Sequence, residues 1–290
     1  MKSVGVTGAT GFVGQRFLEY NKERYRLVLL DLRNTAPNQL DLGGLDAIVH
    51  LAGKAHQMQP IPEQVYFDVN LGLTRQLADQ ALAQGVKNFI YISSVKVYGD
   101  EPRGILTEVS DCIPSDPYGA SKWQAEQYLQ TLQQPGFTVS IVRPPLVYGP
   151  GVKGNMIRLL QLADKKWPLP FGASANARSM VYLDNLVALI NKIVDEPAAG
   201  IFVAGDEKPV ETSDLIRMIR QELGNKAPLF SIPGVLRTLI KKWRPGLYIR
   251  LFGSYVIDNS ATNRALNFLP PVTTAAGVKA MTQWYLRSSR

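Results

Sequence analysis

The stretch SVGVTGATGFVG (residues 3–14) decides the fold, because it joins an apolar run to a glycine-rich turn and then to a helix-like segment. A strand, a turn of this kind and a helix in succession form the start of a βαβ unit that binds a pyrophosphate. Gly8 and Gly11 let the backbone turn tightly and approach the phosphates, and Gly14 lets the helix pack closely on the strand. The alternative is a glycine-rich turn without a ligand.

Short apolar runs alternate with helix-like segments through the first half of the chain, as a parallel sheet with crossover helices requires. The expected strands are SVGVT (3–7), RLVLL (26–30), DAIVHLA (46–52), NFIYIS (88–93) and TVSIVRP (138–144). The expected helices include EQVYFDVNLGLTRQLADQALAQG (63–85) and SKWQAEQYLQTLQQ (121–134). This alternation predicts a doubly wound α/β fold with a parallel sheet.

The pattern loosens beyond about residue 150, where we expect a smaller lobe. Helical stretches are predicted near 155–166, 183–195 and 213–223, with a strand at GIFVAG (200–205). We therefore divide the chain into a nucleotide-binding domain, residues 1–150, which also receives part of the later chain, and residues 151–290, mainly a substrate-binding lobe. Ligands of open α/β sheets bind at the carboxyl ends of the strands, so this lobe is expected to close over that edge.

Composition limits the classes of protein and of site. The chain has 290 residues, 46% of them hydrophobic, which suffices for a sizeable core. Cys112 is the single cysteine, so we expect no intrachain disulfide, no metal site and a reducing, cytoplasmic location. Glycines interrupt the apolar start of the chain, and no apolar run approaches the ~18 residues of a membrane span. We expect no integral membrane segment.

The net charge of +8 raises the question of nucleic-acid binding. The basic residues do not cluster, and the stretch RTLIKKWRPGLYIR (237–250) mixes its cations with apolar residues, as a half-buried surface helix does. We expect no nucleic-acid partner. Part of the charge is expected to serve a diphosphate ligand, and residues 237–250 are expected to attract an anionic membrane surface weakly.

Asp31 ends the second expected strand, 17 residues after Gly14. A carboxylate at this place accepts hydrogen bonds from the ribose hydroxyls of adenosine, which favours NAD over NADP. Arg33 keeps NADP as the alternative, because it suits a 2′-phosphate. The competing interpretation of Asp31 is a turn or capping residue.

The stretch YGASK (118–122) places Tyr118 and Lys122 on one face of a helix. A free phenol, with a pKa of about 10, is a poor proton donor or acceptor near neutrality. An ammonium group ~4 Å away, at an effective dielectric constant of ~20, would lower the pKa by roughly three units. The alternative is a packed tyrosine beside a solvated lysine.

Four segments together resemble the extended short-chain dehydrogenases/reductases: the TGxxGxxG turn, YISSVKVYG (91–99), DPYGASK (116–122) and VRPPLVYGPG (142–151). The resemblance covers essentially the whole chain. It implies a Rossmann-type fold, an NAD cofactor, a homodimer built on helices 63–85 and 117–134, and the catalytic residues Ser94, Tyr118 and Lys122. It also implies further cofactor contacts from Thr10, Phe12, Val13, Asp41, Leu42, Leu51, Ala52, Gly53, Asn70 and Pro145.

The resemblance extends to a UDP-sugar substrate. GNM (154–156), with Asn155, resembles the segment that meets the nucleotide, and Arg178 in ARSMVYLDNL (177–186) resembles a phosphate-binding arginine. Arg250 is either a second phosphate contact or a surface cation. The remaining substrate contacts are expected from His56, Ser94, Val95 and Lys96, whereas His50 is expected to be buried in a strand.

Some residues that similar enzymes carry are absent from this chain, and their absence limits the reactions that it is expected to catalyse. The sugar 4,6-dehydratases that this chain resembles carry an Asp-Glu acid/base pair where Val95 and Lys96 stand, which argues against dehydration. Similar epimerases usually have an asparagine where Leu146 stands. RPPLVYGPGVKGN (143–155) and HLAGKAHQM (50–58) resemble bacterial enzymes that reduce UDP-2-acetamido-2,6-dideoxy-4-hexulose in O-antigen or capsule assembly.

The sequence thus predicts an NAD(P)H-dependent 4-ketoreductase of a UDP-4-keto sugar. Tyr118 would protonate the oxygen on carbon 4, Ser94 would hydrogen-bond that oxygen, and Lys122 would hold the nicotinamide ribose. The alternative is a UDP-glucose or UDP-N-acetylglucosamine 4-epimerase, and a more remote one is a regulator that senses NAD(H) without catalysis.

Overall fold

The structure is a computed structural model of the chain. It describes residues 1–55, 61–101, 104–172, 176–233, 238, 242–243, 248 and 252–288. His56, Arg250 and most of the basic stretch 237–250 fall outside the described residues, so their predicted roles are untested. Among the described helices, none is both long and apolar enough to cross a membrane.

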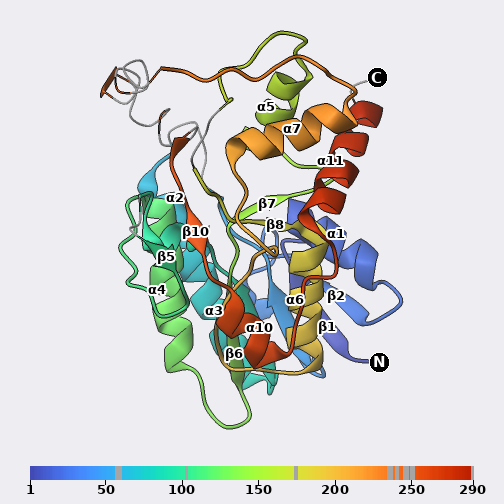
Figure 1. The fold of residues 1–290 in the computed structure, drawn as a ribbon. Helices are drawn as coiled ribbons and strands as arrows, with labels where there is room; N and C mark the ends of the chain where they lie inside the picture. The colour runs from blue at the N-terminus through green and yellow to red at the C-terminus, as the bar shows by residue number, and fades with distance from the viewer. Residues whose placement is uncertain are drawn as a thin grey trace.

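A six-stranded parallel sheet forms the centre of the molecule (Figure 1). Its strand order is β2-β1-β3-β4-β6-β9. The strands are β1 (Ser3–Thr7), β2 (Arg26–Leu30), β3 (Ala47–His50), β4 (Asn88–Ile92), β6 (Thr138–Arg143) and β9 (Gly200–Val203). Every predicted strand is present, with ends that differ from the prediction by at most two residues, and the predicted doubly wound, Rossmann-like α/β fold is confirmed.

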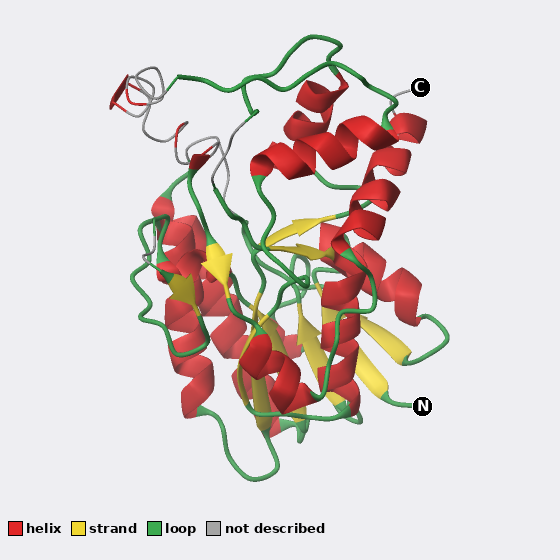
Figure 2. Ribbon diagram, in the orientation of Figure 1, coloured by secondary structure: helices red, strands yellow, loops and turns green. Residues whose placement is uncertain are grey.

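Helices cover both faces of this sheet (Figure 2). One face packs against α1 (Phe12–Asn21) and α6 (Leu183–Asp195), and the other against α3 (Leu73–Ala83) and α4 (Pro117–Thr131). Side chains alternate along each strand, so Val49 of β3 enters the first core and its neighbour Ile48 enters the second. This burial on both faces explains why the strands are continuous apolar runs.

The predicted helix 63–85 is one continuous segment with a π-helical turn inside it. It consists of α2 (Glu63–Phe67), the π-turn η2 (Asp68–Gly72) and α3. Helix α4 begins at Pro117, as the resemblance implied and four residues before the segment 121–134 predicted from the pattern, because the Asp116 carboxylate accepts a hydrogen bond from the Gly119 N–H and caps the helix. The earlier start places Tyr118 in the first helical turn.

A second lobe lies beyond the carboxyl ends of the strands (Figure 1). It is built from α5 (Asn155–Asp164), α7 (Thr212–Glu222), α11 (Thr274–Ser288) and the two-stranded sheet of β7 (Leu146–Tyr148) and β8 (Met180–Tyr182), which share an apolar core. The remaining elements are β5 (Ile105–Leu106), paired with β10 (Val256–Ile257), α10 (Ser260–Leu266) and the 3-10 turns η1 (Pro37–Gln39) and η3 (Val95–Tyr98). Strand β9 returns the later chain to the central sheet.

The strand register brings the carboxyl ends of four strands level with one another. Thr7 is paired with Leu30 and with His50, and His50 is paired with Tyr91. The residues that follow these strands therefore meet at one edge of the sheet, below the second lobe. That edge holds the candidate site.

His50 is 1% exposed in β3, as predicted, and its ring nitrogens bond to the hydroxyls of Thr7 (2.7 Å) and Thr74 (2.8 Å). Burial, with a smaller contribution from the Lys122 charge, lowers the pKa of His50 from 6.5 to about 3. The ring is therefore neutral in the folded protein. Its pair of threonine partners ties β1 to α3.

We predict that His50 makes the protein less stable in mild acid. As the pH falls below about 6.5 the unfolded chain takes up a proton on His50 that the folded chain does not accept until about pH 3, so stability present above this window is lost within it. His50→Gln removes this proton, and its free energy of unfolding should fall less between pH 7 and pH 5. Urea unfolding at several pH values tests this, and parallel pH curves for the two proteins would contradict it.

Candidate active site

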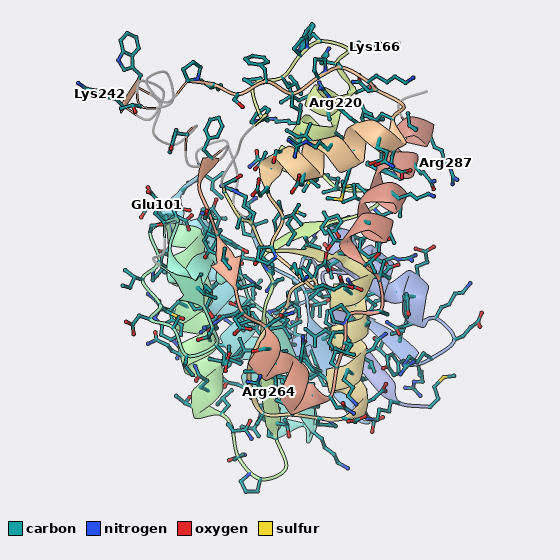
Figure 3. The ribbon with its side chains drawn as sticks, viewed as in Figure 1. Glu101, Lys166, Arg220, Lys242, Arg264 and Arg287 are labelled. Carbon is teal, nitrogen blue, oxygen red and sulfur yellow. The ribbon has the colours of Figure 1, made fainter. Side chains whose placement is uncertain are left out.

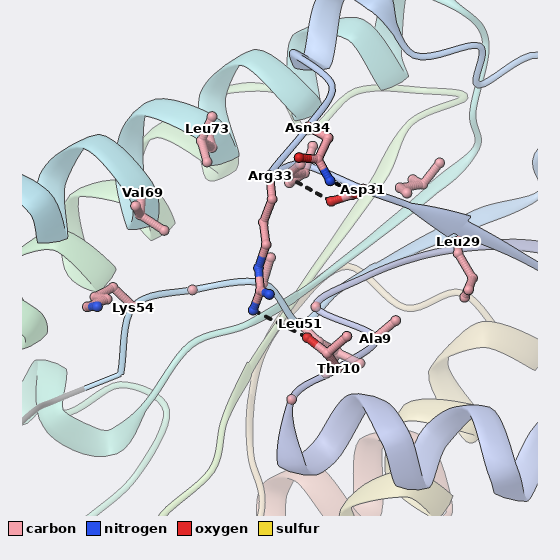
Figure 4. A pocket seen from close by; sticks show the side chains of 16 residues that line it. Ala9, Thr10, Leu29, Asp31, Arg33, Asn34, Leu51, Lys54, Val69 and Leu73 are labelled. Carbon is pink, nitrogen blue, oxygen red and sulfur yellow. Dashed lines mark hydrogen bonds between the residues drawn. The ribbon is translucent and has the colours of Figure 1, made fainter.

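A cavity of about 760 Å³ opens at the carboxyl edge of the sheet (Figure 4). Eight of the predicted cofactor residues line it: Gly8, Thr10, Gly11, Asp31, Arg33, Leu51, Ala52 and Gly53. Sequence reasoning missed other lining residues, which are Ala9, Leu29, Leu30, Leu32, Asn34, Lys54, Val69 and Leu73. Apart from Ala9, which lies inside the glycine motif, these residues belong to no binding motif and are mostly apolar, so only the fold could identify them.

The glycine turn has the geometry that a diphosphate needs. Gly8 has φ +67°, and a Cβ there would lie 2.5 Å from the Ala52 backbone nitrogen. A Cβ on Gly14 would lie 2.1 Å from the Gly8 carbonyl oxygen, so the helix can approach the turn only with glycine at this position. Gly11 begins α1 without a side-chain cap, and the N–H groups of the first turn, from Phe12 to Gly14, remain for an anion.

Asp31 and Arg33 lie side by side after β2, and the Arg33 side chain extends across the cavity toward Thr10 (Figure 4). The Asp31 carboxylate accepts hydrogen bonds from the Arg33 N–H (2.9 Å) and the Asn34 side chain (2.7 Å), and these bonds lower its pKa. The Arg33 guanidinium reaches over the opening and donates to the Thr10 hydroxyl at 3.3 Å. The carboxylate remains ionised beside the cavity, where it suits ribose hydroxyls.

The cavity therefore fits a dinucleotide. It lies within the ordinary range of small-molecule sites, roughly 300–1,000 Å³, and joins a glycine turn to a carboxylate at the end of the next strand. NAD would lie with its diphosphate on the turn of Gly8 and Gly11 and its adenosine ribose near Asp31. Bound there, it would supply a hydride acceptor or donor.

The predicted cofactor residues Asp41, Leu42 and Pro145 do not line the cavity. Asp41 is exposed and bonds to the Gly43 N–H, and neither it nor Leu42 lines the cavity. The Leu42 side chain is fully buried among apolar residues of the α3–α4 face, because its N–H is held by the Gln84 side chain at 2.7 Å. Pro145 is buried just after β6.

Ser94, Tyr118 and Lys122 meet at the end of β4. Ser94 caps the turn η3 that follows β4, and its side chain is close enough to Tyr118, in the first turn of α4, to influence the pKa of that phenol. Lys122, one helical turn further on, is 5% exposed and donates to the Ile92 carbonyl oxygen at 2.9 Å. Its ammonium lies 4.5 Å from the centre of the Tyr91 ring.

The electrostatics differ from the expected ones. Burial raises the pKa of Tyr118 above its usual value of 10, and the hydrogen bond from Ser94 opposes this only in part. Burial also lowers the pKa of Lys122 to about 8, against the attraction of Glu126. The predicted lowering of the Tyr118 pKa by Lys122 is wrong for these side chains, because the ammonium is engaged with Ile92 and Tyr91 and burial dominates.

The π-turn places Asn70 against this group. Asn70 is fully buried, accepts a bond from the Lys54 N–H (2.7 Å) and donates to the Lys54 carbonyl and to Ser121. A Cβ on Gly53 would lie 3.0 Å from the Asn70 amide oxygen and 3.1 Å from the Lys122 ammonium. Gly53 therefore lets the cavity wall and the lysine come together. A π-turn inside a helix often marks a functional site.

Val95 and Lys96, the positions of the missing acid/base pair, have structural partners. Val95 is 7% exposed, and its carbonyl accepts the Tyr255 hydroxyl at 2.5 Å. Lys96 pairs with Asp100 and with the capping residue Asp116, the latter at 3.3 Å. Neither side chain is a carboxyl group able to act as an acid or base in dehydration.

The predicted substrate residues Asn155 and Arg178 belong to the second lobe. Asn155 is exposed at the start of α5, after Gly154 with φ +66°. Arg178 donates from Nε to the Gly253 carbonyl at 2.9 Å, and its backbone pairs with Val210 and Tyr255. Tyr255 thus links the backbone at Arg178 to the Val95 carbonyl, which lies next to the triad of Ser94, Tyr118 and Lys122. No sequence motif predicted this connection.

A buried ion pair joins α4 to strand β6 of the central sheet. Glu126 is fully buried and receives the Arg143 guanidinium from β6, with an Nη2 to Oε2 distance of 2.5 Å. Ser93, next to Ser94, also bonds to Glu126, and Arg143 donates to the Tyr98 hydroxyl at 2.8 Å. Breaking such a pair typically costs about 3–5 kcal/mol. Sequence reasoning missed this network, which fixes the helix that carries Tyr118 and Lys122.

We predict that the cap of α4 is worth about 1 kcal/mol of unfolding free energy. Asp116→Ala leaves the Gly119 N–H without its side-chain acceptor and should lower stability by this amount, as measured by urea unfolding. Asp116→Asn is the matched control, since its amide oxygen can still accept the bond while its charge is lost. Equal losses in both variants would show that the charge, not the cap, stabilises the helix.

Comparison with known proteins places these features in context. Residues 4–205 match the model of the NAD dependent epimerase/dehydratase family. A UDP-glucose 4-epimerase of Vibrio cholerae is 34% identical, over 99% of this chain and 97% of that protein. An N-acetyl-alpha-D-glucosaminyl-diphospho-ditrans,octacis-undecaprenol 4-epimerase of Escherichia coli O157:H7 is 32% identical, over 80% of this chain and 75% of that protein.

Solved structures share the fold. A UDP-glucuronic acid 4-epimerase from Bacillus cereus in complex with NAD superposes with a TM-score of 0.79, over the whole of both chains. At 22% sequence identity this similarity concerns the fold alone.

Proposed function

The chain belongs to the NAD-dependent epimerase/dehydratase family, and from this premise we propose that it is a UDP-sugar 4-epimerase acting on UDP-glucose or UDP-N-acetylglucosamine. The family confirms the predicted nicotinamide cofactor and the resemblance to extended short-chain dehydrogenases/reductases. The predicted 4-ketoreductase becomes the second candidate. The reason is that both relatives described above, one matched over nearly its full length, are 4-epimerases.

The observation that carries the proposal is the meeting of Tyr118, Ser94 and Lys122 beside the cavity of the glycine turn. Tyr118 accepts the proton of the sugar 4-hydroxyl as general base and returns it after the sugar has turned its other face. Ser94 donates a hydrogen bond to the same sugar oxygen. Lys122, a buried cation one turn away, binds the nicotinamide ribose.

The lobe after residue 150 is proposed to hold the UDP part, with Arg178 near the diphosphate and Asn155 near the nucleotide. Arg178 is partly buried, which lowers its pKa only from a very high starting value, so it remains a cation suited to phosphate. Residues 1–150 would hold the cofactor. We further propose a cytoplasmic homodimer built on α3 and α4, which analytical ultracentrifugation tests directly.

One observation favours the 4-ketoreductase. Leu146, which begins β7, stands where epimerases usually carry asparagine, and its side chain is 43% exposed. A leucine here supplies no hydrogen bond to a sugar hydroxyl. The triad serves either reaction, because both pass a proton through the phenol at carbon 4.

The two reactions differ in their use of added cofactor. An epimerase returns its cofactor to the starting state in each cycle, so the purified protein should convert UDP-glucose or UDP-N-acetylglucosamine to the 4-epimer without net loss of NADH. A reductase would instead oxidise one NADH or NADPH for each 4-keto sugar consumed. Both assays should be run in parallel, and failure of both with bound NAD(H) would favour a sensor of the cofactor.

We predict that Tyr118→Phe lowers turnover at least ~100-fold, because it removes the proton-transferring hydroxyl. Cofactor affinity, measured by NADH fluorescence titration, should stay within about twofold. Tyr128→Phe is the matched control, since Tyr128 lies on the same helix and bonds to Asp79 instead. Turnover of Tyr118→Phe equal to that of the control would remove Tyr118 from the mechanism.

We also predict that Asp31 sets the preference for NAD over NADP. Asp31→Ser should weaken NADH binding roughly tenfold, the effect of losing a hydrogen bond to a charged acceptor, and should narrow the difference in affinity between NADH and NADPH. Arg33→Ala should weaken NADPH more than NADH. If neither substitution changes the ratio of the two dissociation constants, the adenosine ribose lies elsewhere.

A further inference from the structure

Two neighbouring loops form a platform at the end of the second lobe. We use this name for residues 165–172, which follow α5, and residues 225–231, which follow α7. Leu169 and Leu229 form a β-bridge, the Phe230 N–H donates to the Leu169 carbonyl at 2.9 Å, and the Gly172 N–H donates to the Phe230 carbonyl at 2.8 Å. The loops therefore run side by side as one unit.

A buried arginine holds the platform together. Arg220 of α7 is 3% exposed, and burial lowers its pKa. Its guanidinium donates to carbonyl oxygens of both loops and of the end of α5, namely those of Ala163, Lys165, Trp167, Ala227 and Pro228, at 2.5 to 3.3 Å. The Asn225 side chain adds bonds to Ala163 and Lys165 at 2.8 and 3.0 Å. The backbone beneath the exposed side chains is thus well fixed.

Large aromatic side chains are displayed on this fixed backbone and on the segment after it. Trp167 is 56% exposed, Phe230 49% and Trp243 80%. Lys165 places its ammonium 5.6 Å from the centre of the Trp167 ring. Exposed aromatic rings held on ordered loops, rather than scattered singly, mark a surface that meets a partner.

The sequence segments that carry these rings are rich in basic residues. Residues 223–257 contain six Lys or Arg and no Asp or Glu, and residues 165–183 contain Lys165, Lys166 and Arg178, again with no acid. Lys165, Lys166, Lys226 and Lys242 are exposed. Figure 3 shows Lys166 and Lys242 at the same end of the molecule, with Arg220 beneath. The adjoining acid Asp164 accepts the Tyr285 hydroxyl at 3.2 Å.

Tryptophan and phenylalanine beside lysine are the side chains favoured at the water interface of a lipid bilayer. The rings settle at the level of the headgroups, and the lysine stems extend to the lipid phosphates. Lysines near an anionic leaflet contribute about 1 kcal/mol each. We propose that the platform and Trp243 dock the protein reversibly on an anionic phospholipid surface.

The position of the platform connects this surface with the candidate site. Beyond the platform, the structure describes the chain as far as Pro233. It then describes only residues 238, 242–243 and 248 before the continuous segment that starts at Phe252. There Gly253 accepts the Arg178 bond and Tyr255 reaches the Val95 carbonyl beside the triad. A lipid surface on the platform would thus lie at the lobe that is proposed to bind the diphosphate. The docking itself does not depend on the reaction catalysed.

Vesicle flotation with the full chain tests the proposal. The protein should float with phosphatidylcholine vesicles that contain 25% phosphatidylglycerol, should float far less with phosphatidylcholine alone, and should be released by 0.5 M salt. Lys165→Ala with Lys166→Ala should lower the partition coefficient at least tenfold, since each lysine is expected to contribute about fivefold. Lys22→Ala with Lys87→Ala removes the same charge from exposed sites at the amino edge of the sheet and should change it less than threefold.

A separate set of variants tests how much the aromatic side chains contribute to vesicle binding. Trp167→Ser with Phe230→Ser should also lower the partition coefficient about tenfold, whereas Leu269→Ser, at an 81% exposed leucine outside the platform, should not. Brominated phosphatidylglycerol should quench tryptophan fluorescence of the parent and quench Trp167→Phe less. Circular dichroism melting curves show whether each variant folds. If the double variant at Trp167 and Phe230 does not fold, Trp167→Gln alone takes its place.

Three results would overturn the proposal. The first is absence of flotation with anionic vesicles at low salt. The second is an equal loss of vesicle binding in the double variant at Lys165 and Lys166 and in the control double variant at Lys22 and Lys87. Such a result would indicate attraction by net charge alone. The third is a change of the sedimentation coefficient by Trp167→Ser without any vesicle binding, which would assign the platform to contact between two copies of the chain.

Discussion

Burial of the Lys122 ammonium at the end of β4 is the constraint on which the candidate site depends. A cation that is 5% exposed needs replacement for its lost hydration, and the Ile92 carbonyl and the Tyr91 ring provide it. Its pKa of about 8 shows that these partners compensate only in part. The lysine therefore has a charge that an additional hydrogen-bond acceptor, such as a ribose hydroxyl oxygen, would stabilise.

Several unusual backbone features follow from this burial. The wall of the cavity must pass close to the ammonium, so Gly53 has no room for a larger side chain. The π-turn η2 directs Asn70 to the same place, where it ties the Lys54 backbone to Ser121 of α4. On the other side of α4, Glu126 joins Arg143 and Ser93, so the helix is fixed to the sheet one turn beyond the lysine.

The two lobes divide the chemistry between them. The sheet edge offers a glycine turn, a carboxylate and a buried phenol, whereas the second lobe offers cations and exposed aromatic rings. Tyr255 is the physical link, since its backbone pairs with the strand of Arg178 and its hydroxyl bonds to the turn that follows Ser94.

The sequence by itself determined the order of strands and helices, the glycine turn with Asp31, and the three residues of the triad. The strands and the glycine turn are encoded locally, because runs of β-branched residues form strands and glycine readily adopts φ +67° beside another backbone. An i, i+4 spacing brings Tyr118 and Lys122 to one helical face, whereas Ser94 and the predicted catalytic roles came from the resemblance to short-chain dehydrogenases/reductases. The start of α4 is also encoded locally, by the cap at Asp116, and it agrees with the helix 117–134 that the resemblance implied.

Only the tertiary structure decided which residues surround the triad and with what electrostatic effect. Glu126, Arg143, Asn70 and Tyr255 come from distant parts of the chain, and their contacts depend on how α4, the π-turn and the second lobe pack. The pKa of Tyr118 rises instead of falling for the same reason. Desolvation is set by all the atoms packed around a group, whereas the sequence shows only its neighbours along the chain.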